Sequence, residues 1–163
     1  MITAFRLAGH LAAHAVWCVS DGATLIPMLG YTDVNDKRVM ERLMGDDLAA
    51  SVERGRGRLE QNPMDANDAV LIYEAYLRRN DGARVDAILV DVRSYAFPDA
   101  RASVAIPFTP FEQGGFKVHR AILAEWTRCE DFEQAVAMDA FFAGVDSHEE
   151  GSKVWQAALD TTA

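Results

Sequence analysis

The sequence predicts a single α+β domain over residues 1–163, with an antiparallel meander sheet of about six to seven strands and helices packed on one face. Three observations support this fold class. Apolar runs separated by turn residues fill residues 68–108, a second group of such runs lies within residues 14–44, and helical patterns occupy separate stretches between and after these groups. Strand groups in meanders with segregated helices are typical of α+β folds. The predicted order of elements is β-β-β-α-β-β-β-β-α-α.

The centre of the meander is a predicted hairpin between residues 69–79 and 84–95. Both runs are rich in Val, Ile, Leu and Tyr, and they flank an Asp-Gly pair at residues 81–82. Asp-Gly between apolar runs is a strong hairpin signal, because the turn requires positive φ and glycine adopts it without strain. A two-residue loop at this pair places Tyr73 opposite Val90. The apolar face in this register consists of Leu71, Tyr73, Ala75, Leu77, Ile88, Val90 and Val92.

The third strand of the meander follows a second turn, at residues 97–100. The proline of this turn pre-sets φ for its first central position, and the aspartate after it suits the second. A five-residue loop then pairs Tyr95 with Arg101. Pro107 donates no backbone hydrogen bond, which indicates a sheet edge or a strand end there. The residues that this strand adds to the apolar face are Val104, Ile106 and Phe108.

The opposite face of the meander combines charged, aromatic and apolar side chains. Its polar members are Glu74, Tyr76, Asp91, Arg93, Tyr95, Arg101 and Ser103, and its apolar members are Val70, Ile72, Val85 and Leu89. One interpretation is a solvated sheet face with cross-strand ion pairs. The alternative is a ligand site in which Glu74 or Asp91 is the acid–base group. In that site Arg93 and Arg101 clamp an anion, and the two tyrosines form the walls.

The chain before the first predicted long helix is expected to contain three strands. Residues 3–13 have a helical composition but no clean apolar stripe. Residues 14–20 and 24–32 are predicted to be strands joined by a turn, and residues 37–44 are predicted to be a third strand. These segments together would form the first strand group of the α+β fold.

A helix is predicted from Asp46 or Asp47 to about Gln61. An aspartate suits this end of a helix because it accepts hydrogen bonds from free backbone N–H groups and complements the helix dipole. Gly55 and Gly57 weaken the helix interior by about 1 kcal/mol each relative to alanine. We expect these glycines to permit close packing on the sheet.

The last third of the chain is predicted to contain one strand, over residues 116–122, followed by two helices. The first helix covers residues 131–143, is capped by its first residue and ends at Gly144. The second covers residues 148–160 and is capped by Ser147. No repeat, linker or low-complexity segment interrupts the chain.

The charge balance is strongly acidic, with a net charge of −9 at pH 7 over 163 residues. Nucleic-acid binders usually carry a basic stripe, and the only basic cluster here is the short group of Arg54, Arg56 and Arg58. We therefore expect no nucleic-acid partner and no anionic-membrane partner. A basic protein is the compatible kind of macromolecular partner.

The two cysteines, Cys18 and Cys129, lie far apart in the sequence and form no Cys-x-x-Cys motif. Reduced thiols in a cytoplasmic protein are the expected state. Residues 1–19 are apolar but include arginine and histidine, so they predict neither a signal peptide nor a membrane span.

His10 and His14 have the i, i+4 spacing of paired metal ligands on a helix. The metalloprotease form of this motif requires a glutamate after the first histidine, and Leu11 stands there. The sequence shows no third ligand, no nucleophile paired with a base and no phosphate-binding loop. It therefore predicts no metal site and no cofactor.

Two functions remain open. The first is a non-enzymatic protein-interaction or accessory factor, for instance of the immunity or secretion-accessory kind, that binds a basic partner. The second is a small anionic-ligand binder, or an enzyme, that uses the polar face of the meander. A concave pocket over that face would favour the second function, and a flat open face would favour the first.

Overall fold

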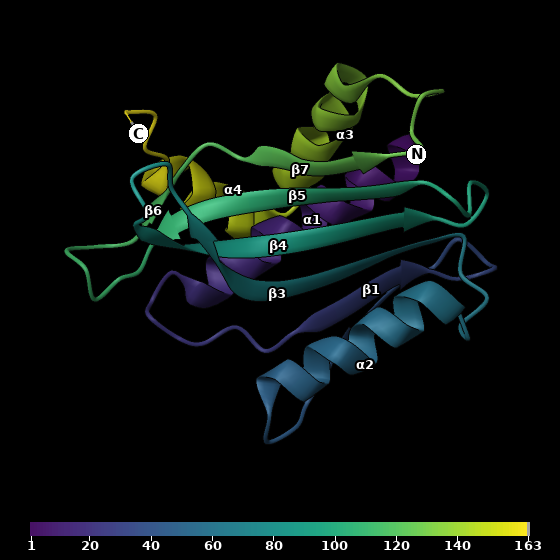
Figure 1. Ribbon diagram of the computed structural model, residues 1–163, viewed down its shortest axis with the longest axis horizontal. Coiled ribbons are helices and arrows are strands. Elements are labelled where there is room, and N and C mark those ends of the chain that lie inside the picture. Colours follow the sequence, from purple (N-terminus) through teal and green to yellow (C-terminus); the bar gives the residue numbers. More distant parts are fainter. Residues whose placement is uncertain (163) are drawn as a thin grey trace.

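A seven-stranded antiparallel sheet runs through the computed structural model, which describes residues 1–162 (Figure 1). The strands are β1 (Met28–Thr32), β2 (Arg38–Arg42), β3 (Asp68–Arg78), β4 (Arg84–Ser94), β5 (Arg101–Thr109), β6 (Lys117–Val118) and β7 (Ile122–Thr127). The helices are α1 (Ile2–Val19), α2 (Leu48–Gln61), α3 (Gln134–Asp146) and α4 (Glu149–Ala158). The sheet order is β2-β1-β3-β4-β5-β6, and β7 pairs with β5 beside β6. The predicted α+β class, single domain and antiparallel meander are confirmed.

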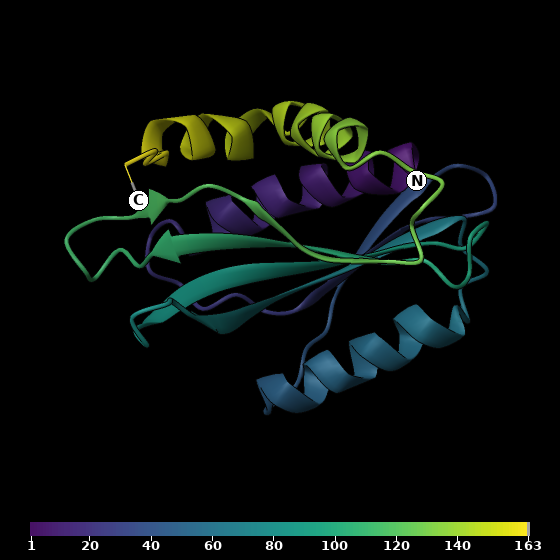
Figure 2. The same ribbon diagram turned by 45° about the horizontal axis from the view of Figure 1, so that its top comes forward.

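The helices form layers above and below the sheet (Figure 2). α1 lies directly on one face, and α3 and α4 pack against the far side of α1. α2 is the exception to the expected single covered face, because it lies on the opposite face and buries Leu59 with Leu71 and Tyr73. The order of layers is therefore α3 and α4, α1, sheet, α2.

α1 continues to Val19 and so includes most of residues 14–20, which were predicted to be a strand. The predicted strand is wrong because α1 lies between the sheet and two other helices, and a helix covered on two sides lacks the single apolar stripe by which a surface helix is recognised. α1 has the length and mean hydropathy of a membrane-spanning helix, but 61% of its residues are buried within the fold.

The β3–β4 hairpin turns at Asp81-Gly82 as predicted, but its register differs by one residue. Tyr73 pairs with Leu89 rather than Val90, because the loop contains three residues instead of two. The amide of Gly82 donates to the carbonyl oxygen of Arg79, and the amide of Arg79 donates to the carbonyl oxygen of Ala83. Gly82 adopts φ of +83°, in the left-handed region that the turn requires.

This shift moves alternate side chains of the hairpin to opposite faces. The α1 side of the sheet buries Val70, Ile72, Ile88, Val90 and Val92 together with Val104, Ile106 and Phe108. The α2 side holds Leu71, Tyr73, Ala75 and Leu89. The predicted apolar face of β4 and β5 is correct, whereas Leu71, Tyr73, Ala75 and Leu77 belong to the other face. The sheet is thus partly buried on both sides. Its strands therefore show a weaker alternation of apolar and polar residues, which is the pattern from which the register was predicted.

The predicted strand over residues 116–122 is split into two strands. β6 pairs with the last residues of β5, the chain leaves the sheet at residues 119–121, and β7 pairs with the rest of β5. The strand 37–44 is confirmed in its central part as β2. The predicted long helix is confirmed as α2, with Asp47 as its N-cap.

The two C-terminal helices begin and end a few residues from their predicted limits. α3 begins after Glu133 and continues past Gly144 to Asp146, and its expected cap at residue 131 is not used. The N-cap of α4 is His148 rather than Ser147, and its imidazole accepts a hydrogen bond from the amide of Gly151. Gly144 does not end α3 because it lies against α1, where an added Cβ would approach the carbonyl oxygen of Arg6 to 2.0 Å.

Candidate functional site

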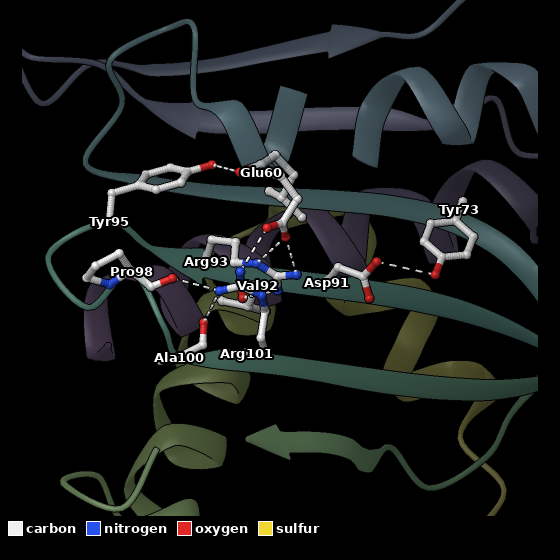
Figure 3. Close-up of polar contacts among 10 residues, drawn as sticks. Glu60, Tyr73, Asp91, Val92, Arg93, Tyr95, Pro98, Ala100 and Arg101 are labelled. Atoms are coloured by element: carbon white, nitrogen blue, oxygen red, sulfur yellow. Dashed lines mark hydrogen bonds and ion pairs between the residues drawn. The ribbon is translucent and has the colours of Figure 1, made fainter. Parts of the chain in front are cut away.

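Arg93 and Arg101, the predicted anion clamp, lie side by side on the α2 side of the sheet (Figure 3). The carboxylate of Glu60 on α2 lies between them. Arg93 donates to Oε1 of Glu60 from Nη2 at 2.8 Å and from Nε at 3.1 Å, and Arg101 donates to Oε2 from Nη2 at 2.8 Å. The two guanidinium groups therefore already hold an anion, which is a side chain of the protein itself.

The remaining members of this cluster also connect α2 to the sheet. The hydroxyl of Tyr95 donates to the carbonyl oxygen of Leu59 at 2.5 Å. Tyr73 donates from its hydroxyl to Oδ2 of Asp91 at 3.3 Å (Figure 3). The same hydroxyl accepts from Nη2 of Arg56 at 3.3 Å. Asp91 and Tyr73 thus belong to a polar bridge between the sheet and the helix.

Burial governs the protonation of these groups. It raises the pKa of Tyr95 to about 12 and raises the pKa of Tyr73. Burial likewise raises the pKa of Asp91, against the nearby charge of Arg93. Burial alone would also raise the pKa of Glu60, but the hydrogen bonds and charges of Arg93 and Arg101 outweigh it, so that this pKa lies below its usual value. Glu60 is therefore held as an anion in its bridge.

Glu74 and Tyr76 lie on the other side of the sheet from this cluster, as a result of the register shift. Glu74 accepts a hydrogen bond from the amide of Leu25 at 2.7 Å. Burial raises its pKa, and Asp86 and Glu112 add to the shift. The ring of Tyr76 is exposed and lies beneath the guanidinium of Arg84, whose Cζ is 3.8 Å from the ring centroid. The six predicted residues thus form two groups instead of one site.

A pocket of about 790 Å³ lies where the tip of the β3–β4 hairpin, the end of β5 and the connection from β6 to β7 meet. We refer to it as the hairpin-end pocket. Its lining residues are Leu77, Arg78, Arg79, Asn80, Asp81, Arg84, Val85, Asp86, Pro107, Phe108, Thr109, Gln113, His119, Arg120 and Ile122. Its volume lies within the usual range for small-molecule sites, about 300–1,000 Å³.

Four arginines surround this pocket, and within residues 1–162 none of them has a carboxylate within ion-pair distance. Arg84 is positioned by the ring of Tyr76, and Arg78 donates to the carbonyl oxygen of Gly82 at 3.3 Å. Arg79 and Arg120 come from different elements and are both exposed. The pocket therefore presents positive charge that the described part of the chain does not neutralise.

His119 forms part of the same pocket. Its Nε2 lies 2.9 Å from Oγ1 of Thr109, whereas its Nδ1 is buried and has no hydrogen-bond partner within the described residues. In the sequence, His119 followed by Arg120 is a possible acid–base group, with no nucleophile placed beside it.

One signal in the sequence could have pointed to this pocket. Arg78-Arg79 and Arg84 flank the Asn80-Asp81-Gly82 turn, so a hairpin alone brings three arginines to one end of the sheet. The approach of Arg120 could not be foreseen, because it depends on the division of the last strand into β6 and β7. Glu60 was missed for a similar reason, since nothing local in α2 indicates which strand residues it faces.

The histidines of α1 meet α4 at the opposite side of the molecule from α2. Nδ1 of His14 lies 3.1 Å from Nε2 of His148, and Nδ1 of His10 lies 2.8 Å from Oγ of Ser147. The hydroxyl of Ser147 donates to the carbonyl oxygen of Gly144 at 2.6 Å, so its proton is not directed at the imidazole of His10 as a nucleophile would require. Within residues 1–162, no group of three or more His, Cys, Asp or Glu side chains has an arrangement that could hold a metal ion.

Comparisons with protein-family models, with curated proteins and with solved structures found no match to this chain.

Proposed function

We propose that the protein is a binding protein for a small anionic ligand, and that the ligand occupies the hairpin-end pocket. The observation that carries the proposal is the meeting of Arg78, Arg79, Arg84 and Arg120 around one cavity of about 790 Å³. A guanidinium group binds carboxylate or phosphate through two parallel hydrogen bonds, which gives it both affinity and geometric selectivity for anions.

The charge of the whole molecule makes this concentration of arginines informative. The net charge is −9, with 16 Lys and Arg residues against 25 Asp and Glu residues. A quarter of all the basic residues nevertheless line this pocket, where they outnumber the two carboxylates of Asp81 and Asp86. A cleft lined by one sign of charge concentrates ligands of the other sign.

The contrast between the two arginine clusters supports the choice of the hairpin-end pocket. Arg93 and Arg101 are neutralised by Glu60, and an external anion would have to displace that carboxylate. Arg79 and Arg120 make no ion pair within the described residues and are open to solvent. An external anion therefore meets less competition at the hairpin-end pocket. The anionic-ligand function is thus proposed at one end of the meander, away from the clamp that the sequence indicated.

The test is a thermal-shift screen of small carboxylates and phosphates, followed by isothermal titration of each ligand that stabilises the wild type. The decisive variant is Arg79→Gln with Arg120→Gln, which removes two exposed charges without removing a hydrogen bond of the fold. We expect it to weaken binding at least about tenfold, since hydrogen bonds to charged groups contribute about 1.5–3 kcal/mol each.

The matched control is Arg128→Gln, an exposed arginine just beyond the other end of β7, and it should bind as the wild type does. Equal binding by the wild type and the double variant would exclude the pocket. If no anion raises the melting temperature of the wild type, the function as a protein-interaction factor for a basic partner becomes the better proposal.

A further inference from the structure

We propose that the free edge of β2 binds an acidic, extended segment of a partner protein, which pairs with β2 as a further strand of the sheet. β2 stands at one end of the strand order, and within residues 1–162 it pairs with β1 alone. The segment would lie against three residues of β2, Arg38, Met40 and Arg42, which we call the basic edge. None of them lines the hairpin-end pocket, so this interaction is independent of the anion-binding function proposed above.

The backbone of the basic edge is free to pair with another strand. At the two ends of the β1–β2 pair, the amide of Asp33 donates to the carbonyl oxygen of Lys37, and the amide of Leu43 donates to that of Pro27. Hydrogen-bonded and non-hydrogen-bonded positions alternate along an antiparallel pair, so these two bonds direct the N–H and C=O groups of the basic edge away from β1. Within residues 1–162 they bond to no other backbone segment. A row of unpaired backbone groups is a site for strand addition.

The side chains of the basic edge all point to the α1 side of the sheet. They lie directly opposite Met28, Gly30 and Thr32 of β1. Met28 belongs to the core beneath α1, and an added Cβ at Gly30 would approach Cδ1 of Leu11 on α1 to 2.0 Å. Directly opposed residues of an antiparallel pair share a face, so the basic edge faces the same way as these β1 residues. A partner strand would therefore meet both arginines on one face.

The arginines on this face have no acidic partner. Arg38, Arg42 and Arg6 of α1 form no ion pair within residues 1–162. Arg6 and Arg38 line a hollow of about 290 Å³, in which Asp36 is the one carboxylate among the described residues. A carboxylate of the partner that binds Arg38 would thus have a second guanidinium in the same hollow.

The uncovered part of α1 adds no acidic group beside the basic edge. Between residues 4 and 17, the α1 residues that are not buried are Arg6, His10, His14 and Trp17, which lie three or four positions apart on one stripe. Burial lowers the pKa of both histidines, and the arginines of the basic edge and neighbouring imidazoles lower it further. Within the described residues, no carboxylate acts on either ring. An acidic partner would therefore displace no internal ion pair here.

The charge pattern favours an acidic strand over a second copy of this chain. Two β2 strands paired about a twofold axis at Met40 would place Arg38 of each copy opposite Arg42 of the other. Like charges directly opposite each other destabilise a sheet, and charged side chains on an edge oppose such self-pairing. A strand with acidic residues two positions before and after an apolar residue would instead complement the whole basic edge.

The experiment measures binding of a peptide with this pattern, acetylated Thr-Glu-Thr-Val-Thr-Glu-Thr amide, by fluorescence anisotropy. We expect saturable binding. Arg38→Gln with Arg42→Gln should raise the Kd about three- to thirtyfold, the range for two exposed ion pairs. Lys117→Gln with Arg128→Gln, which removes two exposed charges elsewhere, is the matched control and should bind as the wild type does.

Two further comparisons separate charge from strand pairing. A peptide with lysine in place of both glutamates should not bind the wild type, but it should bind the charge-reversed variant Arg38→Glu with Arg42→Glu. N-methylation of the valine removes the amide that faces Met40, so it should abolish binding. N-methylation of the threonine after it removes an amide that faces solvent, so it should leave binding intact.

The arginine variants should melt close to the wild type, because both side chains are exposed. Equal binding of the lysine and glutamate peptides by the wild type would overturn the acidic partner. Equal effects of the two N-methylations would overturn strand addition, and the absence of saturable binding would overturn both. If sedimentation shows a wild-type dimer that Met40→Lys dissociates, a second copy occupies the edge and the proposal fails.

Discussion

At the scale of single residues, Glu60 decides what the arginines of β4 and β5 can do. It receives hydrogen bonds from both Arg93 and Arg101, although its own side chain is 46% exposed. An internal anion in this position turns a potential binding site into a contact between a helix and a sheet. The same two arginines without Glu60 would form the clamp that the sequence indicated.

We therefore expect Glu60→Gln to destabilise the protein by about 1 kcal/mol, since the pair is partly exposed and solvent screens it. The measurement is the free energy of unfolding from urea denaturation. Glu149→Gln is the matched control, because its ion pair with Lys153 lies within α4 and does not involve the sheet. Equal and small effects of the two changes would show that the bridge to the sheet contributes nothing.

Gly82 is the residue on which the β3–β4 turn depends. Its φ of +83° costs a residue with a Cβ about 1–2 kcal/mol, and no atom lies within 4 Å of an added Cβ, so the cost is one of backbone conformation alone. Gly82→Val should lower the free energy of unfolding by more than about 1 kcal/mol. Asp81→Asn should change it by less than about 0.5 kcal/mol, because an asparagine oxygen can replace the carboxylate that accepts from the amide of Ala83 at 2.9 Å. Chemical denaturation of the two variants side by side checks the pair, and equal tolerance would place the critical turn residue elsewhere.

At the scale of helices and strands, glycines allow α1 to contact α3 and α4 backbone to backbone. An added Cβ would approach the carbonyl oxygen of Phe141 to 1.7 Å at Gly9 and that of Ala13 to 2.3 Å at Gly151. Gly144 makes the same kind of contact with α1. Backbone atoms cannot yield as the end of a flexible side chain can, so these three positions fix the distance between the helices.

Gly144→Ala and Gly57→Ala provide a matched pair of helix substitutions. Both replace a glycine inside a helix, which by itself favours the folded state by about 1 kcal/mol. At Gly57 no atom lies within 4 Å of the new Cβ, so we expect a gain in melting temperature. At Gly144 the new Cβ would clash with the backbone of α1, so we expect the substitution to lower the free energy of unfolding by about 2 kcal/mol or more. Differential scanning calorimetry gives both values, and a stabilised Gly144→Ala protein would contradict the close crossing of α1 and α3.

At the scale of the whole molecule, the histidines connect stability to pH. The amide of Gly151 donates to Nδ1 of His148 at 2.9 Å, so the proton of this neutral imidazole lies on Nε2, from which it is donated to Nδ1 of His14. An added proton on either ring would place two donors face to face. Arg38 and Arg42 of β2 add positive charge beside His10 and His14, respectively.

These surroundings favour the neutral imidazoles in the folded state. Burial, followed by the charges of Arg38, His148 and His14, lowers the pKa of His10 from 6.5 to about 4. Burial and the charges of His148 and Arg42 lower the pKa of His14 as well. Between about pH 6.5 and about pH 4 the unfolded chain therefore binds protons that the native state excludes. The contribution of these two histidines to the free energy of unfolding is fully present above this window and is lost as the pH is lowered through it.

His10→Gln should reduce the fall in the free energy of unfolding across this pH window, because glutamine does not titrate and its amide can still donate to Ser147. The measurement is urea denaturation of both proteins at a series of pH values across the window. Glu74 and Asp91, whose raised pKa values act in the opposite direction, are common to both proteins and cancel in the difference. Parallel curves for the wild type and the variant would show that His10 is not linked to folding.

The sequence predicted the parts of the fold that local chemistry specifies and missed those that depend on packing. The Asp81-Gly82 turn and the cap at Asp47 follow from residues next to one another in the chain. The register of the hairpin depended on a loop of three residues instead of two, and this one difference sent Glu74 and Asp91 to opposite faces. Asp91, Arg93, Tyr95 and Arg101 lie near one another because they belong to β4, to the residue after it and to β5. Their partner Glu60 and the pocket residue Arg120 come from elements whose placement no local pattern reports.

The position of α1 between the sheet and the last two helices has a consequence for how the chain folds. The contacts that cover its outer side come from residues more than 120 positions later in the sequence, such as Phe141, Gly144 and Gly151. During synthesis, α1 leaves the ribosome before α3 and α4, and its apolar surface stays uncovered until they emerge. Contacts between residues so far apart in the sequence slow folding, and they prolong the lifetime of aggregation-prone intermediates in which apolar surface is exposed. A chaperone that binds nascent chains therefore has a long time to bind α1 before α3 and α4 cover it.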